Sequence, residues 1–170
     1  MISIDTRERA APAILVGAFI GGTLDIAYAA AQTILLGGTP VRMLKSIAAG
    51  LLGRGALSSG AGVAVLGLLL HFVIALGAAT TYYLVSRRMR LLVTHAWICG
   101  LVFGAGVYLF MNRVVLPLSA LRARPALTLT GLFPVMVFVG LAVALSVRRY
   151  AGGPASGGRA ESGQGGSRTT

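Results

Sequence analysis

Four long apolar runs, separated by short charged segments, most constrain how this chain can fold. A helix needs roughly 20 predominantly apolar residues to cross a bilayer. The runs predict membrane spans at about 12–36, 61–85, 91–116 and 127–147. A chain of 170 residues that is 56% hydrophobic and only 11% charged does not suit a soluble domain. The sequence therefore predicts an all-α polytopic membrane protein, built as a bundle of four transmembrane helices.

The segment between the first two runs predicts a short additional helix. Thr39 is a suitable N-cap, Pro40 suits the first helical position, and Gly53 can close the last turn. We expect an amphipathic helix at about 40–52 that lies in the membrane interface. A re-entrant half-helix is the alternative, because residues 47–52 carry no charge.

The two ends of the chain flank a membrane domain that we place at 12–150. Residues 1–11 are the predicted N-terminal segment, and the Gly- and Ser-rich residues 151–170 are predicted to be disordered. The first run has a second interpretation as a signal peptide, because the small residues at 27–29 resemble a cleavage site. Asp25 and the apolar residues that continue to Leu36 disfavour it.

The distribution of Lys and Arg around the spans predicts the orientation. With both termini in the cytoplasm, the tight turn at 87–90 and both ends of the chain lie inside. The inner residues are then Arg7, Arg9, Arg87, Arg88, Arg90, Arg148, Arg149 and Arg159, and the outer residues are Arg42, Lys45, Arg54, Arg113, Arg122 and Arg124. The bias is small and favours cytoplasmic termini.

The net charge of +11 is spread between apolar runs, so it indicates contact with anionic lipid headgroups and no nucleic-acid partner. Cys99 is the only cysteine, which excludes an internal disulfide and a metal site built from several cysteines. No phosphate-binding loop or metal-ligand spacing occurs. We expect no enzymatic activity, no catalytic residues, no metal and no cofactor.

Polar residues within the spans predict one intramembrane site. At a rise of about 1.5 Å per residue, Asp25, His71 and Pro134 fall at one depth, and Tyr108 falls within a turn of it. Pro134 also leaves the carbonyl of Thr130 without its usual helical partner. Charged residues at this depth are costly and are functional candidates. The candidate polar site is Asp25, His71, Tyr108 and Thr130.

Small residues recur every four positions on three of the runs, and such rows let helices approach closely. Asp25 shares one of these rows, and we expect it to point inward with His71. The tyrosines at 82–83 are expected at the lipid interface and Asn112 in helix packing. The predicted packing residues are Gly17, Gly21, Gly67, Gly100, Gly104 and Pro134.

Two function classes remain open. The first is a structural or accessory membrane protein with a satisfied Asp25–His71 pair, acting as a homo-oligomer or with another membrane partner. The second is a small transporter or proton-coupled channel that uses the same pair, since histidine titrates near physiological pH.

Four segments, at 21–28, 40–53, 71–83 and 108–119, resemble small bacterial inner-membrane proteins with four spans and unknown function. The resemblance covers about residues 12–150. It implies a bacterial inner-membrane location and the four-helix architecture. It implies no activity and no site residues.

Overall fold

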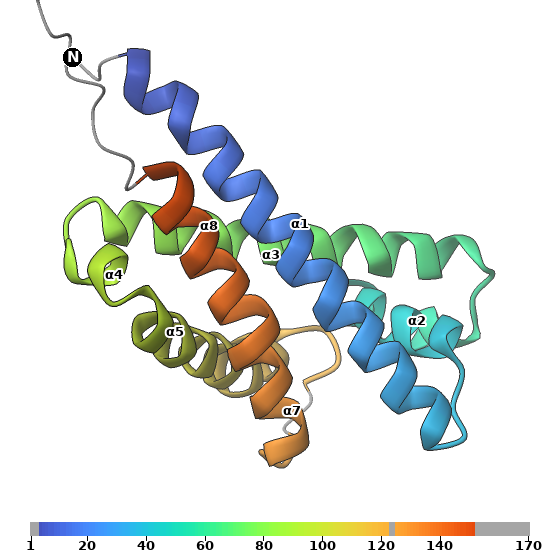
Figure 1. The fold of residues 1–170 in the computed structure, drawn as a ribbon. Helices are drawn as coiled ribbons and strands as arrows, with labels where there is room; N and C mark the ends of the chain where they lie inside the picture. The colour runs from blue at the N-terminus through green and yellow to red at the C-terminus, as the bar shows by residue number, and fades with distance from the viewer. Residues whose placement is uncertain (1–3, 123–124, 152–170) are drawn as a thin grey trace, which may run out of the picture.

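The computed structural model describes residues 4–122 and 125–151 of the chain, and in these ranges every regular element is a helix (Figure 1). Four helical stretches are long and apolar enough to cross a membrane: Ala10–Leu35, Gly62–Ser86, Ala96–Leu118 and Leu129–Tyr150. The predicted all-α, four-span fold class is confirmed. Most predicted span limits lie within three residues of these.

The first helix, α1, runs from Ile4 to Leu35, so it begins eight residues before the predicted span. Pro12 therefore lies inside the helix. The apolar count detects only the stretch suited to lipid, whereas Arg7, Glu8 and Arg9 are good helix formers that extend the helix beyond it.

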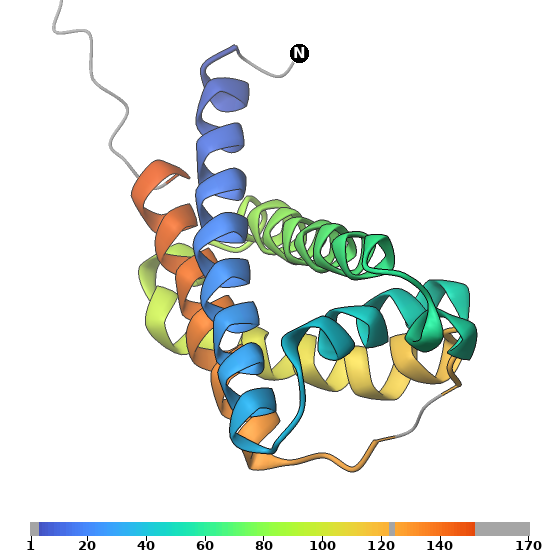
Figure 2. The same ribbon diagram turned by 90° about the vertical axis from the view of Figure 1, so that its right-hand side faces the viewer.

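The predicted short helix is present as α2 (Pro40–Leu52), and its predicted ends are confirmed. Thr39 accepts a hydrogen bond from the backbone N–H of Arg42, and Gly53 ends the helix with a φ of 79°. The 3₁₀ turn η1 (Arg54–Ser58) then leads into α3 (Gly62–Ser86). Figure 2 shows α2 between α3 and the third span, and the N–H of Ala120 donates to the Gly50 carbonyl at 2.9 Å.

The third span begins at Ala96, five residues after its predicted start at 91, because a break separates it from a short helix. A short α4 (Leu91–Thr94) ends at His95, where φ is −110° and ψ is 45°, and α5 (Ala96–Phe110) follows. At this break the buried Tyr82 hydroxyl donates to the Leu92 carbonyl at 2.9 Å. A π-helical turn, η2 (Met111–Val115), and α6 (Leu116–Leu118) complete the span.

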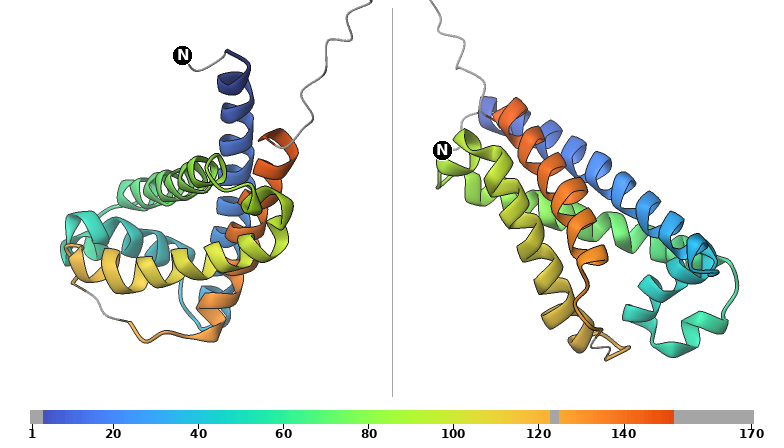
Figure 3. Two further views of the ribbon diagram at one scale, coloured as in Figure 1. Left: turned by 90° about the vertical axis from the view of Figure 1, so that its left-hand side faces the viewer. Right: turned by 60° about the horizontal axis from the view of Figure 1, so that its bottom comes forward.

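The fourth span consists of α7 (Leu129–Pro134), the π-helical η3 (Val135–Leu141) and α8 (Ala142–Ala151). Thr128 caps it by accepting a hydrogen bond from the Gly131 N–H. Figures 1 and 3 show α8 beside α1, with the end of α8, the start of α1 and α4 at one end of the molecule. The predicted disordered tail lies outside the described residues, except for Ala151, which ends α8.

The interior is built mainly from small side chains, and large apolar side chains face outward. The buried cluster contains Ala13, Ala18, Ala75, Ala79, Ala96, Ala144, three valines and two tyrosines. Leu15, Phe19, Leu69, Val102 and Phe133 are all more than half exposed. This arrangement suits a protein solvated by lipid. The two tyrosines, Tyr82 and Tyr83, are buried and do not form the expected interfacial belt, because α4 and α8 pack over the end of α3.

Candidate intramembrane polar site

A cavity of about 220 Å³ lies among α1, α3, the third span and η3. Four polar residues line it: Asp25, His71, Tyr108 and Asn112. Its apolar lining comprises Ile47, Ile74, Ala75, Ala78, Val107, Met111, Val135 and Val139. The structure therefore brings together three of the four predicted site residues and adds Asn112.

His71 reaches across from α3 to the backbone of α1. Its Nε2 atom lies 2.9 Å from the carbonyl oxygen of Gly22. Because a carbonyl only accepts, Nε2 must carry the proton, and Nδ1 is the nitrogen left to gain or lose one. A Cβ on residue 22 would lie 3.1 Å from the Phe72 ring, so the missing side chain permits this close approach of the helices.

Asp25 lies three residues after Gly22, on the neighbouring part of the α1 surface, and is half-buried. It interacts electrostatically with His71. The sequence predicts that the two side chains point inward together. Among the described residues, no hydrogen bond or ion pair satisfies the Asp25 carboxylate, and the imidazole is bonded to Gly22 instead. Both side chains nevertheless line the same cavity.

Tyr108 joins α5 to the start of the fourth span. Its hydroxyl accepts from the Thr128 N–H at 2.9 Å and donates to the Thr128 carbonyl at 3.2 Å. Asn112 donates from Nδ2 to the Tyr108 carbonyl at 2.8 Å. The sequence predicts Asn112 in helix packing, whereas the structure places it on the cavity wall.

Thr130, the fourth predicted residue, does not line the cavity. Its side chain is exposed near the start of α7. Its carbonyl, which Pro134 leaves without a helical donor, lies 3.4 Å from the Tyr28 hydroxyl that donates to it. Thr130 therefore connects α7 to α1, away from Asp25.

Two π-helical stretches form part of the cavity wall. Asn112 and Met111 belong to η2, and Val135 and Val139 belong to η3. Each stretch lies next to a proline, since η3 follows Pro134 directly and η2 ends shortly before Pro117. A proline cannot donate to the carbonyl four residues earlier, which loosens the helix locally, and single π turns are frequent at functional sites. These prolines were the signal in the sequence that could have located the wall.

The predicted packing glycines lie where backbones approach closely, but not all on one surface. A Cβ at Gly17 would lie 3.1 Å from the Val143 Cα, and one at Gly21 would lie 3.1 Å from the Phe138 carbonyl. Gly100 and Gly104 contact the same last span from α5. Gly67 instead contacts α2, where a Cβ would overlap the Leu44 carbonyl. Pro134 is buried at the end of α7.

Within 4–122 and 125–151, no three His, Cys, Asp or Glu residues gather as a metal site would require. Comparison of the chain with protein-family models, with curated proteins and with solved structures finds no match. The function must therefore be argued from the cavity and its residues.

Proposed function

We propose that this chain is a small multi-pass transport protein that binds a proton at Asp25 and His71. The observation that supports the proposal most is the cavity on which both side chains lie, with a carboxylate that receives no hydrogen bond from the described residues. An ionisable group at this depth in a span is expensive unless it is paired or has a purpose.

The hydrogen bonds suggest how the site handles a proton. The bond to Gly22 keeps a proton on Nε2, so His71 gains its second proton at Nδ1. The carboxylate of Asp25 compensates the charge of the protonated ring, with which it interacts electrostatically. Tyr108 and Asn112, each engaged with the backbone, hold the surrounding wall in place.

The test is proton flux in proteoliposomes that carry an imposed pH gradient and an entrapped pH-sensitive dye. Asp25→Asn and His71→Gln should each reduce the flux to that of protein-free liposomes, because each removes a proton-binding group. Thr33→Val is the control, since that hydroxyl lies on the same helix and, within the part of the chain that the structure describes, bonds only to the Ala29 carbonyl. Absence of flux in the parent protein, or full flux in Asp25→Asn, would rule the proposal out.

A structural or accessory role is the second candidate, and the close glycine contacts that join α1 and α5 to the last span favour it. A structural role makes a different prediction for Asp25→Asn and His71→Gln. Each variant would then lower the stability in detergent. The double variant would lose less stability than the sum of the two single losses, as expected for residues that interact. If the protein is a transporter, Asp25→Asn and His71→Gln should instead fold normally.

We further propose a bacterial inner-membrane location with both termini in the cytoplasm, which the Lys and Arg distribution supports. Anionic headgroups are proposed as lipid partners, supported by a hollow at the start of α2 that Arg42 and Lys45 line. We also propose that the chain acts as a homo-oligomer or with another membrane protein.

The orientation has a direct test. Reporter fusions after Arg88 and after Thr170 should report cytoplasm, and fusions after Arg54 and Arg122 should report the outside. The expectation follows from the four spans and the bias of the charged flanks. A periplasmic signal from the fusion at Thr170 would contradict it.

A further inference from the structure

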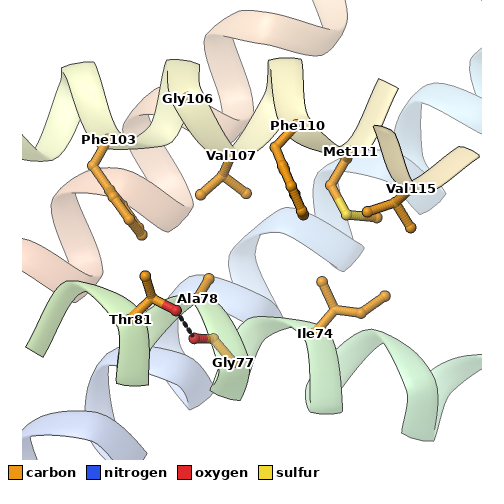
Figure 4. Close-up of a pocket in the computed structure, with 10 residues that line it drawn as sticks. All are labelled: Ile74, Gly77, Ala78, Thr81, Phe103, Gly106, Val107, Phe110, Met111 and Val115. Atoms are coloured by element: carbon orange, nitrogen blue, oxygen red, sulfur yellow. Dashed lines mark hydrogen bonds between the residues drawn. The ribbon is translucent and has the colours of Figure 1, made fainter. Parts of the chain in front are cut away.

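A second hollow, of about 520 Å³, lies between α3 and α5 and is open at the molecular surface. Figure 4 shows Ile74, Gly77, Ala78 and Thr81 on one side and side chains of α5 and η2 on the other. The remaining lining residues are Phe103, Gly106, Val107, Phe110, Met111 and Val115. The hydroxyl of Thr81 donates to the Gly77 carbonyl at 2.8 Å, so the one polar side chain in this groove is already satisfied.

The groove adjoins the polar cavity. Ile74, Ala78, Val107 and Met111 line both. One elongated molecule can therefore place an apolar body between α3 and α5 and a polar end beside Asp25. The volume of the groove lies within the range of roughly 300–1,000 Å³ that is usual for small-molecule sites.

The polar end of this space presents mainly acceptors. The proton on Nε2 of His71, the Tyr108 hydroxyl and Nδ2 of Asn112 are all engaged with backbone carbonyls. What remains is the Asp25 carboxylate, Nδ1 of His71 and Oδ1 of Asn112, which all accept, and one N–H of the Asn112 amide. Neither the carboxylate nor Oδ1 of Asn112 has a donor among the described residues. A matching ligand must bring hydrogen-bond donors and a positive charge.

We propose that the groove and the cavity together bind an amphiphilic amine, with its apolar body between α3 and α5 and its ammonium group at Asp25. The ligand enters from the bilayer through the open side of the groove. This inference rests on the proposed function, because it names the class of molecule that the Asp25 site would exchange for a proton.

The probe is radiolabelled dodecylamine, measured by equilibrium binding to the protein in lipid nanodiscs and corrected with empty nanodiscs. The parent should bind it saturably and should bind dodecanol, which lacks the charge, at least about tenfold more weakly, a difference of about 1.4 kcal/mol. Asp25→Asn should lower dodecylamine binding to the level of dodecanol. Equal binding of the two probes would mean that the groove accepts any alkyl chain, and would overturn the proposal.

Gly77→Leu and Gly106→Leu test the groove itself. A Cβ at either position meets no atom within 4 Å, so both variants should fold while their side chains fill the groove. Both should lose dodecylamine binding, whereas Gly62→Leu, at an equally open position outside the groove, should keep it. Unchanged dodecylamine binding in Gly106→Leu would contradict the inference. A shift of that variant to a smaller oligomer would also contradict it, because it would indicate that a second copy of the chain fills the groove.

The two proposals fail separately. A parent protein that carries protons but does not bind dodecylamine removes this inference and leaves the proposed function standing. Saturable, Asp25-dependent amine binding without proton flux removes the proposed coupling and leaves the binding site.

Discussion

Gly104→Ala should destabilise the bundle by about 1–3 kcal/mol, the usual cost of overpacking a close contact. A Cβ at this position would lie 2.5 Å from the Cα of Met136 and 2.7 Å from the carbonyl oxygen of Val135. Both are backbone atoms of the last span, so no side chain can rotate away to make room. The helices must separate, and the cavity wall that Val135 forms must move with them.

Gly106→Ala is the matched control, because it makes the same chemical change on the same helix where a Cβ meets no atom within 4 Å. Its midpoint of thermal unfolding in detergent should stay close to that of the parent. The measurement compares the two midpoints. Equal midpoints would show that α5 and the last span are not packed through Gly104.

The spans and α2 could be predicted because each is determined by residues within its own segment. Apolar length defines a helix that can cross a bilayer, and Thr39, Pro40 and Gly53 define the ends of α2 by their own hydrogen-bonding and backbone preferences. The break at His95 was not predictable in this way. It coincides with the contact between Tyr82 and the Leu92 carbonyl, and no local pattern indicates that pairing.

The sequence predicted the depth of the polar side chains along the spans better than the helix face on which they lie. Counting residues placed Asp25, His71 and Tyr108 near one level, and all three line one cavity. The row of small residues was expected to give Gly17, Gly21 and Asp25 a common face. Four residues advance a helix by about 40° more than one full turn, so such a row winds around the helix. The glycines consequently contact the last span while Asp25 reaches the cavity.

The hydrogen bonds of the site depended on tertiary structure. The row of small residues singles out Gly21, yet it is the carbonyl of its neighbour Gly22 that receives the His71 imidazole. Asn112 reaches the cavity from a π-helical turn, which changes the direction of side chains relative to a regular α-helix. The surplus of acceptors that suggests a ligand follows from these pairings, so it could not be derived from residue types alone.

Gly67→Ala should detach α2 from α3. A Cβ on residue 67 would overlap the carbonyl of Leu44, and Ala48 of α2 is fully buried close by. Because both contacting segments are backbone, relief requires that α2 move as a unit. We expect faster amide hydrogen exchange throughout 40–52, and little change in α5, when the variant is compared with the parent by mass spectrometry.

Gly77→Ala serves as the control on the same helix, because a Cβ there meets no atom within 4 Å and exchange in α2 should stay as in the parent.

The detachment of α2 in Gly67→Ala also removes Ile47 from the wall of the Asp25 cavity. If the site carries protons, Gly67→Ala should therefore leak protons faster than the parent, since an apolar part of the wall is gone. Slow exchange in α2 of Gly67→Ala would show that the helix docks without this contact, and an unchanged leak despite fast exchange would show that Ile47 does not seal the cavity.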